Sequence, residues 1–258
     1  MKVWITGASS GIGEACALRY ASMGASLILT SSNEARLRAV AGRCAGAAAV
    51  TVLAYDFSDP DGIESLVRAA WAAFGGIDIA FLNAGISQRT GVEDTSMEMV
   101  RRIMEIDYFA PVAAAKALLP LMLGAGGGSI AVTSSIAGRF GFPLRCAYSS
   151  AKHALYGFFE TMRAEYDDRG IHVTIVCPGR VNTNISFASL DKGGKPHGVM
   201  DPGQASGLSA EAAARKIVKA IAHHRREVLV GRGELAMVYV KRFFPGICAR
   251  LSKRLRPV

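Results

Sequence analysis

Cysteine is scarce in this chain, and the few cysteines are not arranged in pairs. They number five, an odd count, and lie scattered at positions 16, 44, 146, 177 and 248. None forms a CxxC or another metal-ligand spacing, which argues against a disulfide framework and a structural metal site. We therefore predict free thiols in a reducing cytoplasm and no bound metal.

Long apolar runs are also missing. No window approaches 18 uninterrupted apolar residues, which argues against a membrane-spanning helix. Residues 1–6 (MKVWIT) already read as a strand, so we expect no signal peptide ahead of it. Half of the 258 residues are hydrophobic, and there is no internal repeat or low-complexity tract. This composition predicts a sizeable core and little disorder.

Acidic residues are few at one end of the chain. The net charge is +9, but residues 215–258 hold 12 Lys+Arg against 2 Asp+Glu, whereas the rest holds 18 against 19. The basic character therefore belongs to the C-terminal segment. A segment of this kind can meet an anionic membrane, nucleic acid or another subunit.

Apolar runs of strand length alternate with longer helix-like stretches. The predicted strands are 2–6, 26–30, 49–55, 77–83, 128–134, 172–177 and 227–231. The predicted helices lie around 11–23, 33–44, 59–74, 96–123, 147–169 and 209–224. Most strands are continuous apolar runs, as in a parallel sheet covered on both faces. The pattern predicts an α/β fold, a doubly wound Rossmann fold with a seven-stranded, mostly parallel sheet and helices on both faces.

One region lacks this periodicity. Residues 186–208 show no clear pattern, and such a segment is usually a substrate lid or poorly ordered. We predict a single domain over residues 1–233, with a substrate loop at about 184–208. Residues 234–258 then form a basic amphipathic C-terminal extension that is broken at Pro245.

A glycine-rich turn follows the first strand. Residues 6–13 (TGASSGIG) lead directly from that strand into a helix. Glycines let the backbone approach a pyrophosphate, and a helix N-terminus offers free N–H groups and a positive dipole end. The spacing GxxxGxG is a variant of the dinucleotide fingerprint GxGxxG. Its place between a strand and a helix favours cofactor binding over a simple tight connection.

With these motifs the sequence resembles the short-chain dehydrogenase/reductase family over nearly the whole chain. Five motifs match in order: TGxxxGxG at 6–13, Asp56 after the third strand, Asn83-Ala84-Gly85 after the fourth, Ser135 with Tyr148 and Lys152, and PGxVxT from Pro178 to Thr183. Residues 108–120 and the C-terminal region are similar to its hydroxysteroid-dehydrogenase-like branch. The resemblance implies a cofactor site formed by Gly7, Ser9, Ser10, Gly11, Ile12, Gly13, Ser32, Arg36, Asp56, Phe57, Asn83, Ala84, Gly85, Tyr148, Lys152, Pro178, Gly179, Val181 and Thr183.

The resemblance assigns the chemistry to three side chains. Hydride transfer to a carbonyl leaves an alkoxide that Tyr148 would protonate, but an unperturbed tyrosine has a pKa of roughly 10. Lys152 follows four residues later on the same helix face, where its ammonium lowers that pKa and can hold the ribose hydroxyls. Ser135, at the end of the neighbouring strand, would hydrogen-bond the substrate oxygen as charge develops. An ordinary surface helix pair is the alternative for the tyrosine and lysine.

The chain departs from the family pattern at two places. Asp107 stands where the family has an asparagine that holds a proton-relaying water, so we expect effects on the relay and on the pH optimum. After the second strand the family carries an acid for NAD, or for NADP an arginine at the position of Ser32 or a basic residue at that of Ser10. This chain has neither. Its small hydroxyls leave room for a 2′-phosphate, with Arg36 nearby, so we predict NADP(H) as the preferred cofactor and NAD(H) as the alternative.

The substrate pocket is expected to be largely apolar. The segments that contact substrate in this family supply Ile136, Phe140, Phe142, Leu144, Ile185, Phe187, Leu190 and Met200. We predict an NAD(P)(H)-dependent oxidoreductase acting on a lipophilic ketone or secondary alcohol. The alternative is a dinucleotide-binding sensor or scaffold without turnover. A sugar-nucleotide epimerase or dehydratase is disfavoured by the glycine spacing and the chain length.

Partners follow from the family and from the basic extension. The resemblance implies a homodimer or homotetramer, and we expect the extension to pack over the pocket or against another subunit. Contact with an anionic membrane is the alternative, which would place this cytoplasmic protein peripherally at the inner membrane surface. No recognition motif accompanies the charge, so we predict no nucleic-acid binding.

Overall fold

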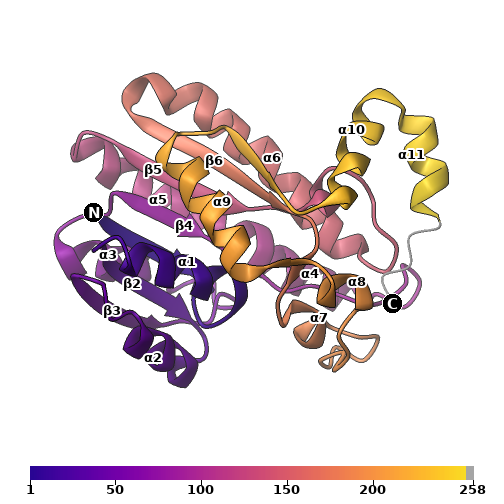
Figure 1. Cartoon of the computed structure of the whole chain (residues 1–258), viewed down its shortest axis with the longest axis horizontal. Coiled ribbons are helices and arrows are strands. Elements are labelled where there is room, and N and C mark those ends of the chain that lie inside the picture. Colours follow the sequence, from indigo (N-terminus) through magenta and orange to yellow (C-terminus); the bar gives the residue numbers. More distant parts are fainter. Residues whose placement is uncertain (254–258) are drawn as a thin grey trace.

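All seven predicted strands are present and form one sheet in the computed structural model, which describes residues 1–253 (Figure 1). Its spatial order is β3-β2-β1-β4-β5-β6-β9, and every neighbouring pair is parallel. The order reverses between β1 and β4, which creates the crevice where doubly wound sheets bind ligands. The strands are β1 (Lys2–Thr6), β2 (Ser26–Ser31), β3 (Ala49–Ala54), β4 (Ile79–Leu82), β5 (Gly128–Thr133), β6 (Ile171–Pro178) and β9 (Glu227–Val230).

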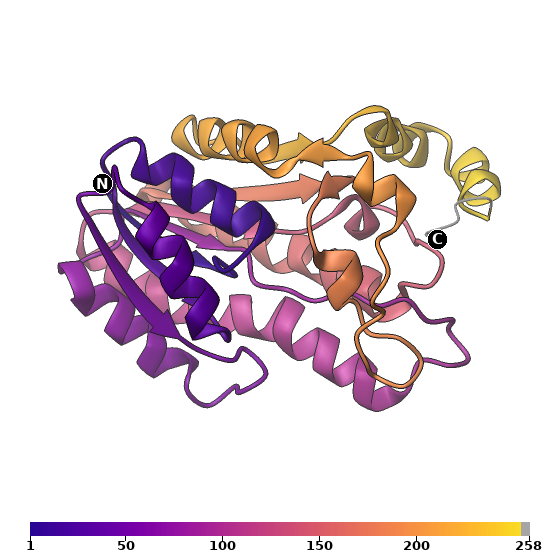
Figure 2. The same ribbon diagram turned by 60° about the horizontal axis from the view of Figure 1, so that its bottom comes forward.

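Helices cover both faces of the sheet, which confirms the predicted doubly wound fold (Figure 2). One face carries α1 (Gly11–Ala21), α2 (Glu34–Arg43) and α9 (Ala210–Ala222), and the other carries α3 (Ile63–Phe74), α5 (Ala110–Gly124) and α6 (Cys146–Tyr166). Successive side chains of a strand point to opposite faces. Thus Leu27 and Leu29 of β2 enter one core, while Ile28 enters the other.

The helical segment from 97 to 124 is continuous but not uniform. It consists of α4 (Met97–Met104), the π-helical turn η1 (Glu105–Phe109) and α5. By length and composition alone this segment could cross a membrane, although its apolar residues do not form one unbroken run. Core helices of water-soluble folds meet the same criterion, and here Ala114 and Leu118 pack in the core beneath the sheet.

The region without sequence periodicity contains short regular elements. These are α7 (Ile185–Ala188), α8 (Pro202–Ala205) and a two-stranded parallel sheet of β7 (Val181–Asn182) and β8 (Leu208–Ser209). Four-residue helices and two-residue strands are too short to produce a periodic pattern, so the sequence did not reveal them. Two further 3-10 turns are η2 (Ile136–Gly138), after β5, and η3 (Asp167–Arg169), after α6.

The C-terminal extension forms two helices at the carboxyl ends of the strands, the same end of the sheet at which α7 and α8 lie (Figure 1). A 3-10 turn, η4 (Gly233–Leu235), leads into α10 (Ala236–Phe243) and α11 (Pro245–Ser252). Pro245 begins α11, so the predicted break at this proline is confirmed. Met237 and Val240 pack against the cluster of Ile136 and Phe140. Residues 254–258 of the predicted extension lie outside the described residues.

Candidate active site

The glycine-rich turn joins β1 to α1 in conformations that require glycine. Gly7 and Gly11 have φ values of 65° and 58°. A Cβ atom on Gly7 would lie 2.9 Å from Ala84 Cα, and one on Gly13 would overlap the carbonyl oxygen of Gly7. These glycines therefore bring β1, α1 and the segment after β4 closer together than side chains would permit.

The start of α1 offers donors to an anion. Ser10 occupies the N-cap position, but its side chain makes no capping hydrogen bond. The first N–H groups of a helix, here those of Gly11, Ile12 and Gly13, have no acceptor within the helix. Free donors, the positive end of the helix dipole and a surface without side chains fit the pyrophosphate of a dinucleotide.

The residues expected to select the cofactor lie at the end of β2. The hydroxyls of Ser9 and Ser31 are 2.8 Å apart, so Ser31 joins this strand end to the glycine-rich turn. Ser32 and Arg36 are exposed beyond that pair, and the Arg36 backbone N–H donates to Asn33 Oδ1 at 2.9 Å. Ser31 was not singled out in the sequence, because a hydroxyl pair 22 residues apart has no local signal.

Asp56 and Phe57 follow β3 and face in different directions. Asp56 is exposed, and its Oδ1 accepts the backbone N–H of Ser58 at 3.0 Å. The Phe57 side chain is buried in the core and packs edge-to-face on Tyr55. The Asp56 carboxylate is therefore accessible to a cofactor, whereas Phe57 can offer its backbone.

The Asn83-Ala84-Gly85 segment joins three strands. Thr6 Oγ1 accepts the backbone N–H groups of Asn83 at 2.9 Å and of Ala84 at 3.0 Å. The Asn83 side-chain oxygen accepts the Thr133 hydroxyl at 3.0 Å. These hydrogen bonds tie β1, β4 and β5 together at the crevice.

Tyr148 and Lys152 lie one turn apart on α6, and the lysine is held from two further elements. Its ammonium is 5.7 Å from the centre of the Tyr148 ring and donates to the Thr133 carbonyl oxygen at 2.9 Å. The same ammonium lies 3.0 Å from Asp107 Oδ2, as an ion pair rather than a well-aligned hydrogen bond. All three charged or phenolic side chains are buried.

Asp107 lies in the π-helical turn η1 and reaches the lysine past a glycine. A Cβ on Gly85 would lie 2.9 Å from Asp107 Oδ2 and 3.3 Å from Lys152 Nζ, so a side chain there would displace the pair. Burial raises the pKa of Asp107, while the Lys152 ammonium and the N–H of Ile86, which donates to Oδ1 at 2.8 Å, act in the opposite direction.

Ser135 follows β5 and lies between the sheet and a pocket. Its hydroxyl accepts the N–H of Ala137 at 3.1 Å and makes a long contact of 3.4 Å with the carbonyl oxygen of Pro178. Pro178 ends β6, and the N–H of the following Gly179 donates to Val230 at 2.8 Å. The serine is thus directed by two neighbouring strand ends.

The rest of the segment after β6 returns to the glycine-rich turn. Val181 is buried in the core. Thr183 is half-buried, and a Cβ on Gly11 would lie 3.0 Å from its methyl group. The segment therefore passes directly beside the start of α1.

Two residues that the sequence did not single out support this arrangement. The Gln88 side-chain oxygen accepts the N–H groups of Ala147 at 2.9 Å and of Tyr148 at 3.1 Å, so it caps the helix that carries the tyrosine. Glu234 of the C-terminal extension accepts the N–H of Arg180 at 2.8 Å. Both contacts join segments more than 50 residues apart, which local motifs do not report.

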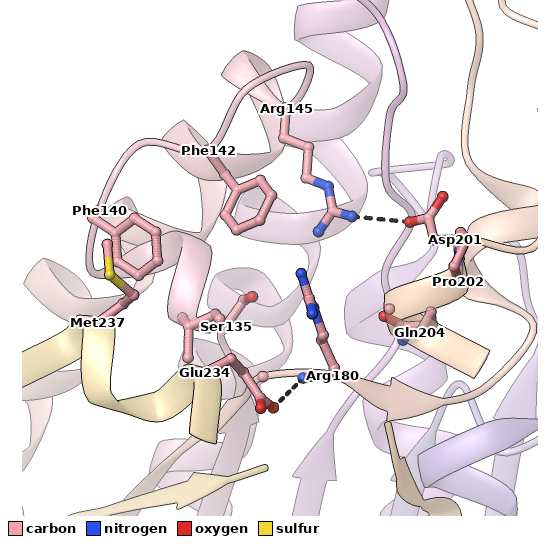
Figure 3. Close-up of a pocket in the computed structure, with 13 residues that line it drawn as sticks. Ser135, Phe140, Phe142, Arg145, Arg180, Asp201, Pro202, Gln204, Glu234 and Met237 are labelled. Atoms are coloured by element: carbon pink, nitrogen blue, oxygen red, sulfur yellow. Dashed lines mark hydrogen bonds and ion pairs between the residues drawn. The ribbon is translucent and has the colours of Figure 1, made fainter. Parts of the chain in front are cut away.

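A pocket of about 160 Å³ opens beside Ser135 (Figure 3). Ile136, Phe140 and Phe142 line it, but the other predicted lining residues do not: Leu144, Ile185, Phe187, Leu190 and Met200. Its remaining walls include Arg145, Arg180, Asp201, Gln204, Glu234 and Met237. The pocket is therefore of mixed polarity, which corrects the expectation of a largely apolar one. The long loop directs Asp201 and Gln204 toward the pocket, while Phe187 is 40 % exposed.

The five cysteines are free, as predicted. Within residues 1–253, no three His, Cys, Asp or Glu side chains gather as a metal-binding group.

A wound parallel sheet with a glycine-rich turn and a buried Tyr–Lys pair at its crevice is typical of a dinucleotide-dependent oxidoreductase. The family model described as short chain dehydrogenase matches residues 1–192. The chain therefore belongs to the short-chain dehydrogenase/reductase family.

Curated relatives match over almost the whole chain. "Dehydrogenase/reductase SDR family member 7B" of Mus musculus is 36% identical over 96% of this chain and 79% of its own length. "Dehydrogenase/reductase SDR family protein 7-like" of Drosophila melanogaster is 34% identical over 93% of this chain and 75% of its own length.

Solved structures agree with the fold and represent both nicotinamide cofactors. A short chain dehydrogenase/reductase from Burkholderia phymatum in complex with NAD has a TM-score of 0.84 and 25% identity, covering 100% of this chain and 96% of that one. An alcohol dehydrogenase from Thermococcus sibiricus complexed with 5-hydroxy-NADP has a TM-score of 0.75 and 25% identity, covering 90% and 96%. The family fold is thus one that binds NAD or NADP.

Proposed function

We propose that this chain is an NAD(P)(H)-dependent oxidoreductase that interconverts a ketone and a secondary alcohol. The observation that supports the proposal is the buried Tyr148–Lys152 pair on α6, whose ammonium is held at the end of β5, two residues before Ser135. A sensor or scaffold without turnover has no need of a buried ammonium next to a tyrosine, since burying charge is costly.

Each of these side chains has a part that its surroundings permit. Tyr148 gives a proton to the substrate oxygen in reduction and takes it back in oxidation. The Lys152 ammonium, held by Thr133 and Asp107, stabilises the phenolate form of the tyrosine. Ser135 donates its proton to the oxygen as negative charge develops there, because its present contact with Pro178 is long. A nicotinamide dinucleotide bound along the crevice supplies or accepts the hydride.

NADP(H) is the cofactor we propose, with NAD(H) as the alternative. Neutral hydroxyls at the end of β2 support this choice, because Ser9, Ser31 and Ser32 present no carboxylate to repel a 2′-phosphate. Arg36 is exposed one turn into α2 and carries the charge that a phosphate would attract.

We propose a lipophilic substrate, a cytoplasmic homo-oligomer and peripheral membrane contact through the C-terminal extension. Phe140, Phe142 and Met237 provide the apolar wall of the pocket. The outer side of the extension combines exposed apolar side chains with neighbouring basic ones, a composition suited to an anionic lipid surface. These residues are Tyr239, Phe243, Phe244, Ile247 and Leu251, with Lys241, Arg242 and Arg250.

Co-sedimentation with vesicles tests the membrane contact. We expect binding to vesicles that contain phosphatidylglycerol, and loss of binding in the double variant Phe243→Glu/Phe244→Glu. Equal binding of both proteins would contradict the assignment.

The proposed activity is tested with Tyr148→Phe, which removes one oxygen atom. Wild-type protein should bind NADPH more tightly than NADH and reduce apolar ketones. The variant should keep NADPH binding and lose at least about 100-fold in kcat, because the proton donor is gone. Folded wild-type protein that binds neither cofactor would contradict the proposal and favour the alternative of a scaffold with the family fold.

A further inference from the structure

The pocket beside Ser135 contains more arginine than its own carboxylates neutralise. Three guanidinium groups, those of Arg89, Arg145 and Arg180, lie in or directly behind its wall. Two carboxylates, Asp201 and Glu234, face them. We propose that the substrate carries an anionic group, a carboxylate or a phosphate, which binds between Arg145 and Arg180. The proposal rests on the oxidoreductase function proposed above, because it places the substrate carbonyl at Ser135 and Tyr148.

Arg89 and Asp201 satisfy one another and leave the other two arginines to the pocket. Arg89 donates to Asp201 from Nε at 3.1 Å and from Nη2 at 2.5 Å, and its Nη1 donates to the Gln88 carbonyl at 2.7 Å. The side chains of Arg89 and Asp201 are 2% and 5% exposed. This buried pair fixes α8 and the long loop against the segment after β4. In it, the Arg89 charge neutralises the Asp201 charge.

Arg145 shares the Asp201 carboxylate with Arg89. Its Nη2 lies 3.2 Å from Asp201 Oδ2, while its Nε is buried without a hydrogen-bond partner in the described part of the chain. The guanidinium lies over the Phe142 ring at 4.9 Å. Burial, then the charge of Arg89, lowers the pKa of Arg145 to about 10. A second negative charge in the pocket would therefore be favourable for this group.

The Arg180 guanidinium has even fewer polar partners than that of Arg145. Its backbone N–H donates to Glu234, but its guanidinium makes no hydrogen bond or ion pair with any of residues 1–253. The guanidinium instead lies against Gly203, where a Cβ would be 2.7 Å from Arg180 Cζ. The glycine of α8 thus provides the space that this side chain occupies.

The view into the pocket shows how these groups are directed. Arg145 and Arg180 enter from opposite sides, and Ser135 lies on the same cavity (Figure 3). Phe140, Phe142 and Met237 form the remaining side. Two guanidiniums facing one cavity can bind the oxygens of one planar or tetrahedral anion, and such charge-assisted hydrogen bonds are strong. The apolar side would then take the hydrocarbon part of the substrate.

The test uses ketones that differ in charge alone. A methyl ketone, the same chain ending in a carboxylate and the same chain ending in a phosphate ester are compared by kcat/KM, with two to six carbons between the groups. We expect wild-type protein to prefer one anionic series by at least about tenfold. Arg180→Gln should lose that preference, measured as the ratio of kcat/KM for the anionic and the neutral ketone in the same protein. Arg232→Gln, an exposed arginine outside the pocket, serves as the control and should keep it.

The outcomes separate this proposal from the proposed function. Preference for neutral ketones, or an anion preference that Arg180→Gln leaves intact, would overturn the anionic subsite alone. Absence of any ketone turnover would overturn the proposed function.

If no ketone is turned over, a binding measurement still tests whether the anionic subsite exists. With saturating NADP⁺ covering the start of α1, inorganic phosphate should raise the melting temperature of wild-type protein and of Arg232→Gln. It should raise that of Arg180→Gln less. Equal shifts in all three proteins would contradict the subsite.

Discussion

The proposed cofactor side and the proposed substrate side of the crevice, called the cofactor side and the substrate side below, are built from different groups. The cofactor side, formed by residues 6–13, 31–36 and 83–85, uses glycines, hydroxyls and backbone N–H groups in close contact. The substrate side, formed by residues 139–145, 180–204 and 234–237, uses arginines and carboxylates in buried pairs. Backbone geometry suits a dinucleotide, because its phosphates accept hydrogen bonds from backbone N–H groups. Charged side chains, in contrast, can select one substrate over others by its charge and shape.

The two sides also differ in how much free energy is required to form them. Close backbone packing needs only residues without side chains, whereas buried ions must each find a counter-ion. The substrate side is therefore the more fragile of the two, and single substitutions should distinguish them.

The largest effect is expected on the substrate side, at Asp201. Asp201→Asn leaves Arg89 buried without its partner and removes the only carboxylate that Arg145 contacts among residues 1–253. We expect a loss of about 3–5 kcal/mol in the free energy of unfolding, measured in urea. Glu64→Gln, in an exposed pair with Arg68, is the matched control and should cost less than about 1 kcal/mol. Similar losses for both would mean that the buried pair is not what holds the loop.

On the cofactor side, Gly13→Ala should have the next largest effect. The added methyl group would overlap the Gly7 carbonyl, which opens the turn. We expect a loss of about 1–3 kcal/mol in stability and at least tenfold weaker NADPH binding by fluorescence titration. Gly42→Ala is the control, because a Cβ at this position in α2 meets open space and should not weaken binding. Undiminished binding by Gly13→Ala would show that the turn tolerates a wider geometry.

Asp107 lies between the two sides, and Asp107→Asn should shift the pH dependence of activity. The carboxylate offsets part of the Lys152 charge that acts on Tyr148. Without it, a group that titrates beside the lysine is gone, so kcat/KM for alcohol oxidation should vary less with pH over the range in which Asp107 titrates. Superimposable pH profiles would show that Asp107 does not act on the tyrosine through the lysine.

Stability provides a second measurement at the same residue. Because burial raises the pKa of Asp107, the protonated form contributes stability that is present below its ordinary pKa of about 3.9 and is lost as pH rises through the raised pKa. Asp107→Asn removes this loss. The difference in free energy of unfolding, variant minus wild type, should therefore become more positive as the pH rises from 4 to neutral, whatever its sign at pH 4, and a constant difference would contradict the raised pKa.

The smallest expected effect concerns the choice of cofactor. Ser32→Asp adds a carboxylate at the exposed end of β2, where it would repel a 2′-phosphate. The ratio of NADPH to NADH affinity should fall by about tenfold, which is about 1.4 kcal/mol. Ser32→Asn, similar in size and uncharged, should leave the ratio unchanged. An unchanged ratio in both variants would move the selectivity to another residue, of which Ser31 is the nearest.

Much of the fold was predictable because its signals are local. The seven strands of the sheet are apolar runs bounded by turns, and their predicted limits differ from the observed ones by at most two residues. The same holds for the glycine-rich turn, whose residues are consecutive. Tyr148 and Lys152 could be paired because residues four positions apart on a helix lie on the same face.

The remainder depends on contacts between distant segments. Arg89 and Asp201 are 112 residues apart and Gln88 and Tyr148 are 60 apart, so neither pair leaves a pattern in the sequence. The pocket was expected to be apolar because apolar residues are the ones that periodicity predicts to be buried. It is partly charged because paired arginines and carboxylates can also be buried, and pairing is invisible before the chain folds.

The sequence by itself determined the class of fold, the glycine-rich turn proposed for the dinucleotide and the shared helix face of Tyr148 and Lys152, since each depends on neighbours within one strand, turn or helix. Only the tertiary structure decided that Asp107 contacts Lys152, that Glu234 and Met237 of the C-terminal extension line the pocket and that two arginines share this pocket with Ser135. These depend on where separate segments meet, which burial and charge balance settle only in the folded chain.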